Sequence, residues 1–242
     1  TLFKALDLGA VDFTAKPTRR VSIELQTIGK DLLRKVRGIK NIRLDILSKN
    51  LELLESDEIA KVPGVIGKKN HSIDIVAIGS STGGPAALQI ILTRLPADFN
   101  AATVISQHMP KGFTGPLSER LNKMSQLRIK EAEDNDHIKR GTVYICPGGF
   151  HLGIVEKNHK LVVALKEGKL THKYTPSVDH MMTSVAEHYG SSAMGVILTG
   201  MGNDGKDGML EIKTKGGYTI AEAESSAVVF GMPAEAIKNN AV

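Results

Sequence analysis

The sequence predicts an α/β fold with a doubly wound, mostly parallel, Rossmann-like sheet and an inserted antiparallel hairpin. From residue 73 onward, short runs rich in Val and Ile alternate with longer stretches of helical spacing, a pattern typical of βαβ units. Several of the apolar runs are followed directly by Gly, Ser, His or Asp, which indicates a turn at the end of the strand. Of the 242 residues, 41% are hydrophobic and 24% charged, which is typical of a globular chain.

The individual elements follow from hydrophobic periodicity and turn residues. Strands are predicted at 73–78, 102–107, 142–145, 194–199 and 218–221. Helices are predicted at 85–95, 114–124, 177–189 and 206–215. Residues 151–155 and 161–165, separated by a polar turn at 157–158, read as the antiparallel hairpin.

The first 72 residues differ from this pattern. Residues 1–17 show a short helical pattern, then Gly9, then an apolar stretch at 10–13 that predicts a strand closed by Lys16–Pro17. Seventeen residues cannot bury a core, so they are predicted to be the end of another folding unit. Residues 18–72 have helical spacing and Gly/Pro breaks, which indicates a partly helical linker. We therefore expect three segments, 1–17, 18–72 and 73–242.

Charge and composition exclude several functions. The net charge of +5 comes from the linker, where 12 Lys and Arg face 7 acidic residues, because residues 73–242 hold 17 of each sign. With 4% aromatic residues and no Trp, a nucleic-acid partner is not expected. The single cysteine, Cys146, allows no disulfide and no zinc pattern, so no metal is expected. Without a signal peptide or a long apolar run, the chain is expected to be cytoplasmic, with no insertion in a membrane.

Ser81 stands at a predicted turn between a strand and a helix. The run 79–83 fits the G-x-S-x-G pattern of a nucleophile elbow, and Pro85 suits the first turn of a helix. The backbone amides of Thr82 and Gly83 would then face an oxyanion, with the helix dipole behind them. Taken alone, the run is also compatible with a turn that caps a helix or holds a phosphate.

Two further strand ends carry polar side chains. His108 follows the strand at 102–107, and Asp204 lies in the loop after the strand at 194–199. A lone histidine is more often structural than catalytic. Open α/β sheets nevertheless bind ligands at the carboxyl ends of their strands, so Ser81, His108 and Asp204 could converge there as nucleophile, base and orienting carboxylate.

Two other interpretations compete with this triad. The loop 200–205 matches the dinucleotide fingerprint G-x-G-x-x-G, with Glu222 near the spacing of a ribose-binding acid. Against a dinucleotide, too few βαβ units follow the loop, and Asp204 would place negative charge beside a pyrophosphate. An α/β-hydrolase would need the order Ser, acid, His; that order could use only Asp179 with His180 or His188, which share or adjoin one helix.

Taken together, the motifs resemble one family, the chemotaxis protein-glutamate methylesterases of the CheB type. The resemblance covers the chain from about residue 73 to its end and rests on AIGSSTGGP (77–85), QHMPKGFT (107–114), VYICPGG (143–149), PSVD (176–179), LTGMGNDG (198–205) and VFGMP (229–233). Residues 1–17 are similar to the end of a response-regulator receiver domain, with Lys16–Pro17 matching its lysine-proline signature.

The resemblance implies a serine esterase and amidase without a cofactor. It would remove methyl groups from methylated glutamates, and deamidate glutamines, on the cytoplasmic helices of chemotaxis receptors. Ser81 would be the nucleophile, His108 the general base and acid, and Asp204 the partner of the imidazole. Backbone groups near Thr82 and Met201 would line the oxyanion site. A non-catalytic receptor-binding domain with the same fold stays open as an alternative.

Overall fold

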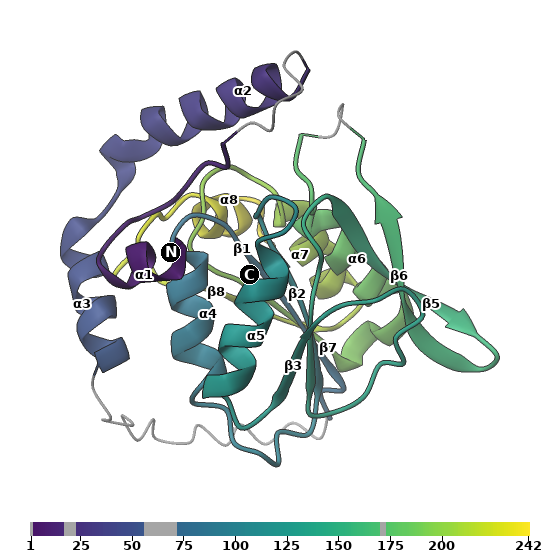
Figure 1. Cartoon of the computed structure of the whole chain (residues 1–242). Coiled ribbons are helices and arrows are strands. Elements are labelled where there is room, and N and C mark those ends of the chain that lie inside the picture. The colour runs from purple at the N-terminus through teal and green to yellow at the C-terminus, as the bar shows by residue number, and fades with distance from the viewer. Residues whose placement is uncertain (1, 17–22, 56–71, 170–172) are drawn as a thin grey trace.

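A six-stranded, entirely parallel sheet forms the centre of the protein, seen in a computed structural model that describes residues 2–16, 23–55, 72–169 and 173–242 (Figure 1). The strands lie in the order β3-β4-β2-β1-β7-β8. Their bounds are β1 Ile75–Ser80, β2 Ala102–Gln107, β3 Arg128–Glu131, β4 Thr142–Ile145, β7 Ala193–Ile197 and β8 Tyr218–Ala221. Strands β5 (Phe150–Lys157) and β6 (Lys160–Glu167) form a separate antiparallel hairpin. The predicted α/β class and the inserted hairpin are therefore confirmed.

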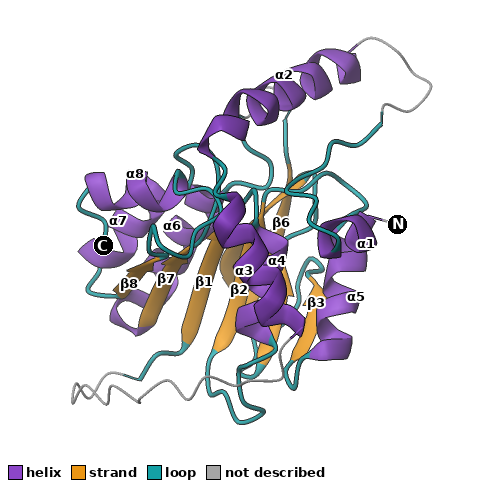
Figure 2. Ribbon diagram, turned by 90° about the vertical axis from the view of Figure 1, so that its left-hand side faces the viewer, coloured by secondary structure: helices purple, strands orange, loops and turns teal. Residues whose placement is uncertain are grey.

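Helices cover both faces of the sheet (Figure 2). Helices α4 (Gly84–Leu92) and α5 (Thr114–Met124) pack on one face, and α6 (Val178–Tyr189) and α7 (Lys206–Thr214) pack on the other. Alternate residues of β1 pack into the two helical layers. Val76 and Ile78 belong to the core on the α4 side. Ile75 and Ala77 belong to the core on the α6 side. This period of two is why a continuous apolar run forms a strand buried on both faces. Helix α8 (Met232–Lys238) lies beside α7 and β8.

The strand order places three predicted site residues at one edge of the sheet. β1 pairs with β2 on one side and with β7 on the other, in a register that sets Ser80 opposite Gln107 and Gly79 opposite Ile197. From β1 the strand order first extends to one side, through β2, and later to the other side, through β7. Open α/β sheets bind ligands at the carboxyl ends of the strands where the order reverses in this way.

The N-terminal segments pack on this layered core. Helix α1 (Leu2–Asp7) is followed by α2 (Ile23–Gly38), η1 (Ile39–Asn41) and α3 (Leu44–Glu55), so much of the described range 23–55 is helical, in line with its predicted helical spacing. Helix α3 contacts α4, and Ile46 and Leu47 pack on Val228 and Val229. Helix α2 passes over the edge of the sheet at which β1 and β7 end (Figure 1).

Several boundaries differ from the sequence predictions. The predicted strand at 10–13 is wrong: these residues join neither sheet of the described chain, and Asp12 contacts Thr82 and Lys35 through its side chain. Strand β3 was not predicted, since only Ile129 of its four residues is buried, as befits an edge strand. Helix α8 was also missed. The predicted break at 62–70 lies outside the described residues, as does Pro17.

None of the helices in the described ranges combines the length and the apolar composition that crossing a membrane requires.

Candidate active site

Ser81 lies in a tight turn between β1 and α4. Its amide donates to the carbonyl of Thr199 at 3.0 Å, and its own carbonyl accepts from the amide of Gly84 at 2.9 Å. Gly83 adopts a left-handed conformation with φ of 80°. Within the described ranges, the amides of Thr82, Gly83 and Met201 donate to no protein acceptor. These three amides are therefore free of acceptors in the described part of the chain, and their role as an oxyanion site beside Ser81 stays a prediction.

The buried amide of Gln107 fixes the backbone of Ser81 relative to that of His108. Its Nε2 donates to the carbonyl of Ser81 at 2.9 Å and to that of His108 at 3.1 Å, while Ser80 Oγ donates to its Oε1 at 2.6 Å. A β-carbon at Gly84 would stand only 2.0 Å from Gln107 Oε1, so glycine is required for this approach. Sequence reasoning quoted Gln107 as part of a motif but assigned it no role.

His108 and Asp204 are joined as the sequence predicts. Their side chains meet through Nε2 and Oδ2 at 2.7 Å, and both are buried, with 7% and 2% of the side-chain surface exposed. Nδ1 of His108 is buried and has no hydrogen-bond partner among the described residues. Ser81, 4% exposed, makes no side-chain hydrogen bond to the ring. The structure therefore lacks the predicted hydrogen bond between Ser81 and His108, and their pairing in catalysis is kept as a proposal.

The position of Asp204 determines which ring nitrogen can act as a base. An ionised carboxylate accepts hydrogen bonds only, so the neutral imidazole must carry its proton on Nε2. The lone pair then belongs to Nδ1, the nitrogen that has no partner in the protein. His108 therefore presents a buried, unoccupied acceptor nitrogen, which is what abstraction of a hydroxyl proton requires.

Asp204 is anchored at the N-terminus of α6. Its carboxylate accepts from the amide of Val178 at 2.7 Å, from that of Asp179 at 3.1 Å and from the hydroxyl of Ser177 at 3.1 Å. Burial raises the pKa of Asp204, but the hydrogen bond and charge of His108 and the two amides together lower that pKa below its ordinary value. Asp204 is thus held in the ionised form.

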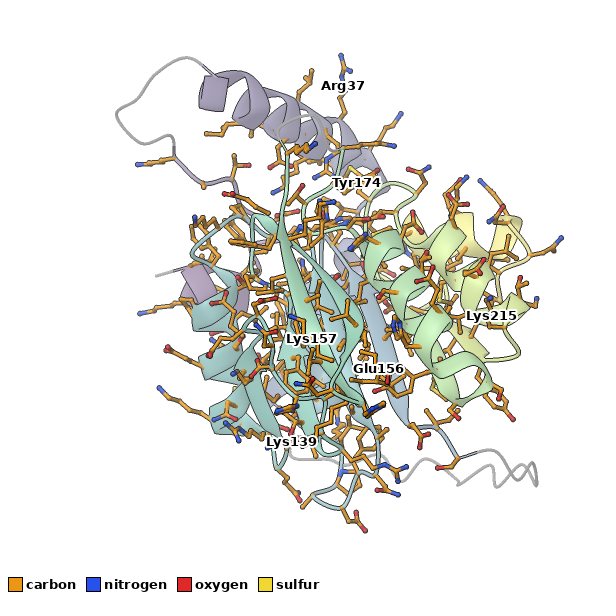
Figure 3. The ribbon with its side chains drawn as sticks, turned by 90° about the vertical axis from the view of Figure 1, so that its right-hand side faces the viewer. Arg37, Lys139, Glu156, Lys157, Tyr174 and Lys215 are labelled. Atoms are coloured by element: carbon orange, nitrogen blue, oxygen red, sulfur yellow. The ribbon has the colours of Figure 1, made fainter. Side chains whose placement is uncertain are left out.

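Tyr174 was not predicted and lies directly on the histidine. Its ring stacks on that of His108, with centroids 4.9 Å apart and planes at 5°. The guanidinium of Arg34 in α2 lies over the ring of Tyr174, 5.9 Å from the ring centroid. The hydroxyl of Tyr174 donates to Asn203 at 3.3 Å. Figure 3 shows Tyr174 below α2, with Arg37 pointing outward. No periodic signal marks Tyr174, because its role depends on this packing.

The N-terminal segments also contact the elbow. Thr82 Oγ1 donates to the carboxylate of Asp12, which is paired with Lys35 of α2 at 3.0 Å. The side chain of Met201 fills the space in which a β-carbon of Gly38 would stand. Residues from the N-terminal segment and from α2 thus cover the candidate site on the side away from the sheet.

Asp179 belongs to the same cluster of charges. Burial raises the pKa of its carboxyl to about 6; the amide of Gly208 opposes this rise and the charge of Asp204 adds to it. The ordinary value is 3.8, so the folded protein holds this proton more tightly than the unfolded chain. The associated stability is complete below the ordinary value and is lost as the pH rises through about 6.

Asp179→Asn is therefore expected to stabilise the protein more at pH 8 than at pH 5, because Asn cannot ionise. The difference in melting temperature between variant and wild type should grow by on the order of a few degrees over this range. Thermal unfolding at both pH values measures it. Asp207→Asn removes the same charge from an exposed neighbour and serves as the control. A constant difference for Asp179→Asn would contradict the raised pKa.

The competing interpretations do not fit the geometry. The carboxylate of Glu222 accepts from the amide of Thr199 at 2.6 Å, so it serves the fold and does not face a ribose site. Burial raises its pKa. In the alternative order of a triad, Asp179 would address a histidine, but its Oδ1 accepts from amides of α7, and His188 bonds to the carbonyl of Ser184. The buried Cys146, whose pKa burial raises to about 12, is no rival nucleophile.

NAD or NADP at millimolar concentration is expected to leave the melting temperature unchanged. A ligand that binds the folded state raises the melting temperature by linkage, and the loop 200–205 has its acid Asp204 committed to His108 and α6. Differential scanning fluorimetry with each cofactor measures this. A saturable upward shift would restore the dinucleotide interpretation.

Fold and site together define a hydrolase of carboxylic esters: a parallel sheet with a serine elbow, and an imidazole–carboxylate pair at the same edge. The sequence model of the CheB methylesterase family matches residues 76–242. The crystal structure of the Thermotoga maritima CheB methylesterase catalytic domain is similar to this chain, with a TM-score of 0.68 and 46% identity over 71% of this chain and 90% of that one. The chain belongs to the CheB methylesterase family.

Similar full-length proteins agree with this assignment. "Protein-glutamate methylesterase/protein-glutamine glutaminase 3" of Geobacter sulfurreducens is 44% identical over 257 residues, which cover 100% of this chain and 69% of that protein. A protein-glutamate methylesterase/protein-glutamine glutaminase of Archaeoglobus fulgidus is 42% identical over 97% of this chain and 66% of its own length. The chain thus spans about two thirds of the length of these relatives.

Proposed function

We propose that this chain is a protein-glutamate methylesterase and protein-glutamine deamidase of chemotaxis adaptation. Its substrates would be the cytoplasmic helices of methyl-accepting chemotaxis receptors, as the names of its relatives and the family suggest. Ser81, His108 and Asp204 would form the catalytic triad. The observation that carries this proposal is the buried pair of His108 and Asp204, which leaves Nδ1 of the imidazole unpartnered at the edge where Ser81 lies.

The first step is attack by Ser81 Oγ on the side-chain carbonyl of methylated glutamate. Nδ1 of His108 takes the hydroxyl proton as the bond from oxygen to carbon forms, and Asp204 stabilises the resulting imidazolium. The carbonyl oxygen becomes an oxyanion, which would accept hydrogen bonds from the amides of Thr82, Gly83 and Met201. Each such donor contributes a factor of about 10²–10³ to kcat.

Collapse of this intermediate completes acylation. The bond to the methoxy oxygen breaks, His108 returns its proton to that oxygen, and methanol leaves. Water then attacks the acyl-serine with His108 again as the base, which frees glutamate and restores the Ser81 hydroxyl. With glutamine as the substrate, ammonia leaves in place of methanol by the same steps.

We assign residues 73–242 to the catalytic domain, 18–72 to a linker and 1–17 to the end of a receiver domain. The contacts of Asp12 with Thr82 and of Arg34 with Tyr174 support a role of the first two segments near the site. Because Ser81 is 4% exposed, we expect a receptor helix to displace these contacts when it binds.

Methanol release from a methyl-labelled cytoplasmic receptor fragment tests the proposal, with wild type compared to Ser81→Ala. Steady release by the wild type alone is the expected result. No release by folded wild-type protein, with the receptor fragment shown to be methylated, would contradict the proposed substrate.

A further inference from the structure

Two carboxylates cap each other's helices beside the candidate active site. Asp204, in the loop before α7, accepts from the first-turn amides of α6. Asp179, in the first turn of α6, accepts in turn from the amides of Asp207 and Gly208 in α7, at 3.0 and 2.8 Å, and both bonds end on its Oδ1. The N-terminus of each helix is therefore capped by an acid that lies in, or just before, the other helix.

The N-terminal ends of α6 and α7 are in close contact at Gly208. A β-carbon at Gly208 would stand 2.6 Å from Cβ of Met182 and 3.0 Å from the carbonyl oxygen of Asp179. Gly208 is buried, and its lack of a side chain permits this approach. The N-terminus of α7 is thereby seated on the first turns of α6.

Helix α7 depends on Asp179 for its cap. Its N-cap residue is Gly205, which has no side chain to accept from the first turn. Helix α6 has both Ser177, which accepts from the amide of His180 at 3.2 Å, and Asp204. Asp179 therefore supplies the side-chain acceptor for the amides that follow Asp204 by three and four residues.

We propose that Asp179 is a positioning residue, which holds Asp204 at His108 by capping α7. The chain from Asp204 to Gly208 is short, so release of the α7 end displaces the Asp204 carboxylate from Nε2 of His108. A misplacement of about 1 Å in a catalytic group can reduce the rate about 10²-fold. This inference rests on the proposed function, because it assigns Asp179 to the same triad.

Two substitutions at Asp179 separate the cap from the charge. Asp179→Asn keeps the Oδ1 acceptor for both amides and loses the charge, whereas Asp179→Ala loses both. Ser184→Ala is the matched control, because Ser184 in α6 also makes two backbone hydrogen bonds, to Ile154 N at 2.7 Å and Ile154 O at 3.0 Å, away from the triad.

The experiment measures kcat and KM for methanol release, together with the low-field proton NMR resonance of the His108 Nε2–H group. Asp179→Ala should lower kcat at least about tenfold, leave KM within about twofold and weaken the resonance. Asp179→Asn and Ser184→Ala should keep kcat within about threefold and retain the resonance. A stability defect alone would not remove the resonance from folded protein.

Three results would overturn the proposal: folded Asp179→Ala with wild-type kcat and resonance, an equal loss of kcat in Asp179→Asn, or an equal loss in Ser184→Ala. If Asp179→Ala does not fold, the Asn variant still decides, since a loss there assigns the effect to charge and not to the cap. The resonance is independent of turnover, so failure of the proposed function, seen as an inactive wild type, is distinguished from failure of this inference.

Discussion

Ser81→Ala is expected to abolish methanol release from methylated receptor fragments. The neighbouring hydroxyls of Ser80 and Thr82 donate to Gln107 and Asp12, which leaves the Ser81 hydroxyl as the candidate nucleophile at the elbow. The amides of the proposed oxyanion site can still polarise an ester, but water lacks the placement of Oγ. Rates should fall by several orders of magnitude, toward the residual about 10³–10⁴-fold acceleration over water that triad-free sites retain.

Two controls accompany this variant. Ser106→Ala removes a buried hydroxyl from β2, where it faces Met181 Sδ at 3.3 Å, and should leave activity unchanged. His108→Gln should be nearly as inactive as Ser81→Ala, and the double variant hardly worse, because triad members act as one unit. Circular dichroism checks folding. Wild-type turnover by folded Ser81→Ala protein would refute the serine mechanism.

Asp204→Asn is expected to lower kcat by about 10⁴, the effect of the equivalent change in a well-studied serine protease. Oδ2 of Asp204 accepts from both His108 and Val178, so an amide nitrogen placed there would face the Val178 N–H and would also donate to Nε2. The imidazole would then carry its proton on Nδ1, which removes the base. If the amide of the Asp204→Asn variant adopts the opposite orientation, its nitrogen faces the backbone N–H of Asp179, so one donor again faces another.

Receptor binding, measured beside the acylation rate, separates this loss from simple misfolding. Because the tautomer is reversed and not the fold, the variant should bind the receptor fragment with wild-type affinity while its acylation rate falls. Rapid-quench measurement of acyl-enzyme formation, with equilibrium binding alongside, gives both quantities. Equal losses of binding and acylation would show that Asp204 serves only the structure of the α6 and α7 ends.

Much of the fold was predictable because the signals are local. A strand buried on both faces, such as β1, must be a continuous apolar run, and the glycines after it mark the turn that holds Ser81. The convergence of Ser81, His108 and Asp204 on one edge followed from the parallel sheet alone. The edge strand β3 could not be predicted in this way, because a strand with one buried residue has no continuous apolar run.

The details of the site were not predictable, since they depend on how separate elements pack. Nothing in the sequence indicates that Asp204 binds Nε2 rather than Nδ1, because the choice is set by the position of α6. The stacking of Tyr174 on His108 and the contact of Arg34 from α2 arise in the same way. The amphipathic pattern of the linker indicated a helix but not what it covers.

The strand order has a consequence for folding kinetics. Ser81 and His108 follow consecutive strands, β1 and β2. Asp204 follows β7, which pairs with β1 on the side opposite β2 and comes after β2, β4 and the hairpin in the sequence. Closing such a long loop is slow, because its entropy is lost before the new contacts form. The triad is therefore complete only after β7 has paired with β1, so esterase activity is expected to appear no earlier than this pairing.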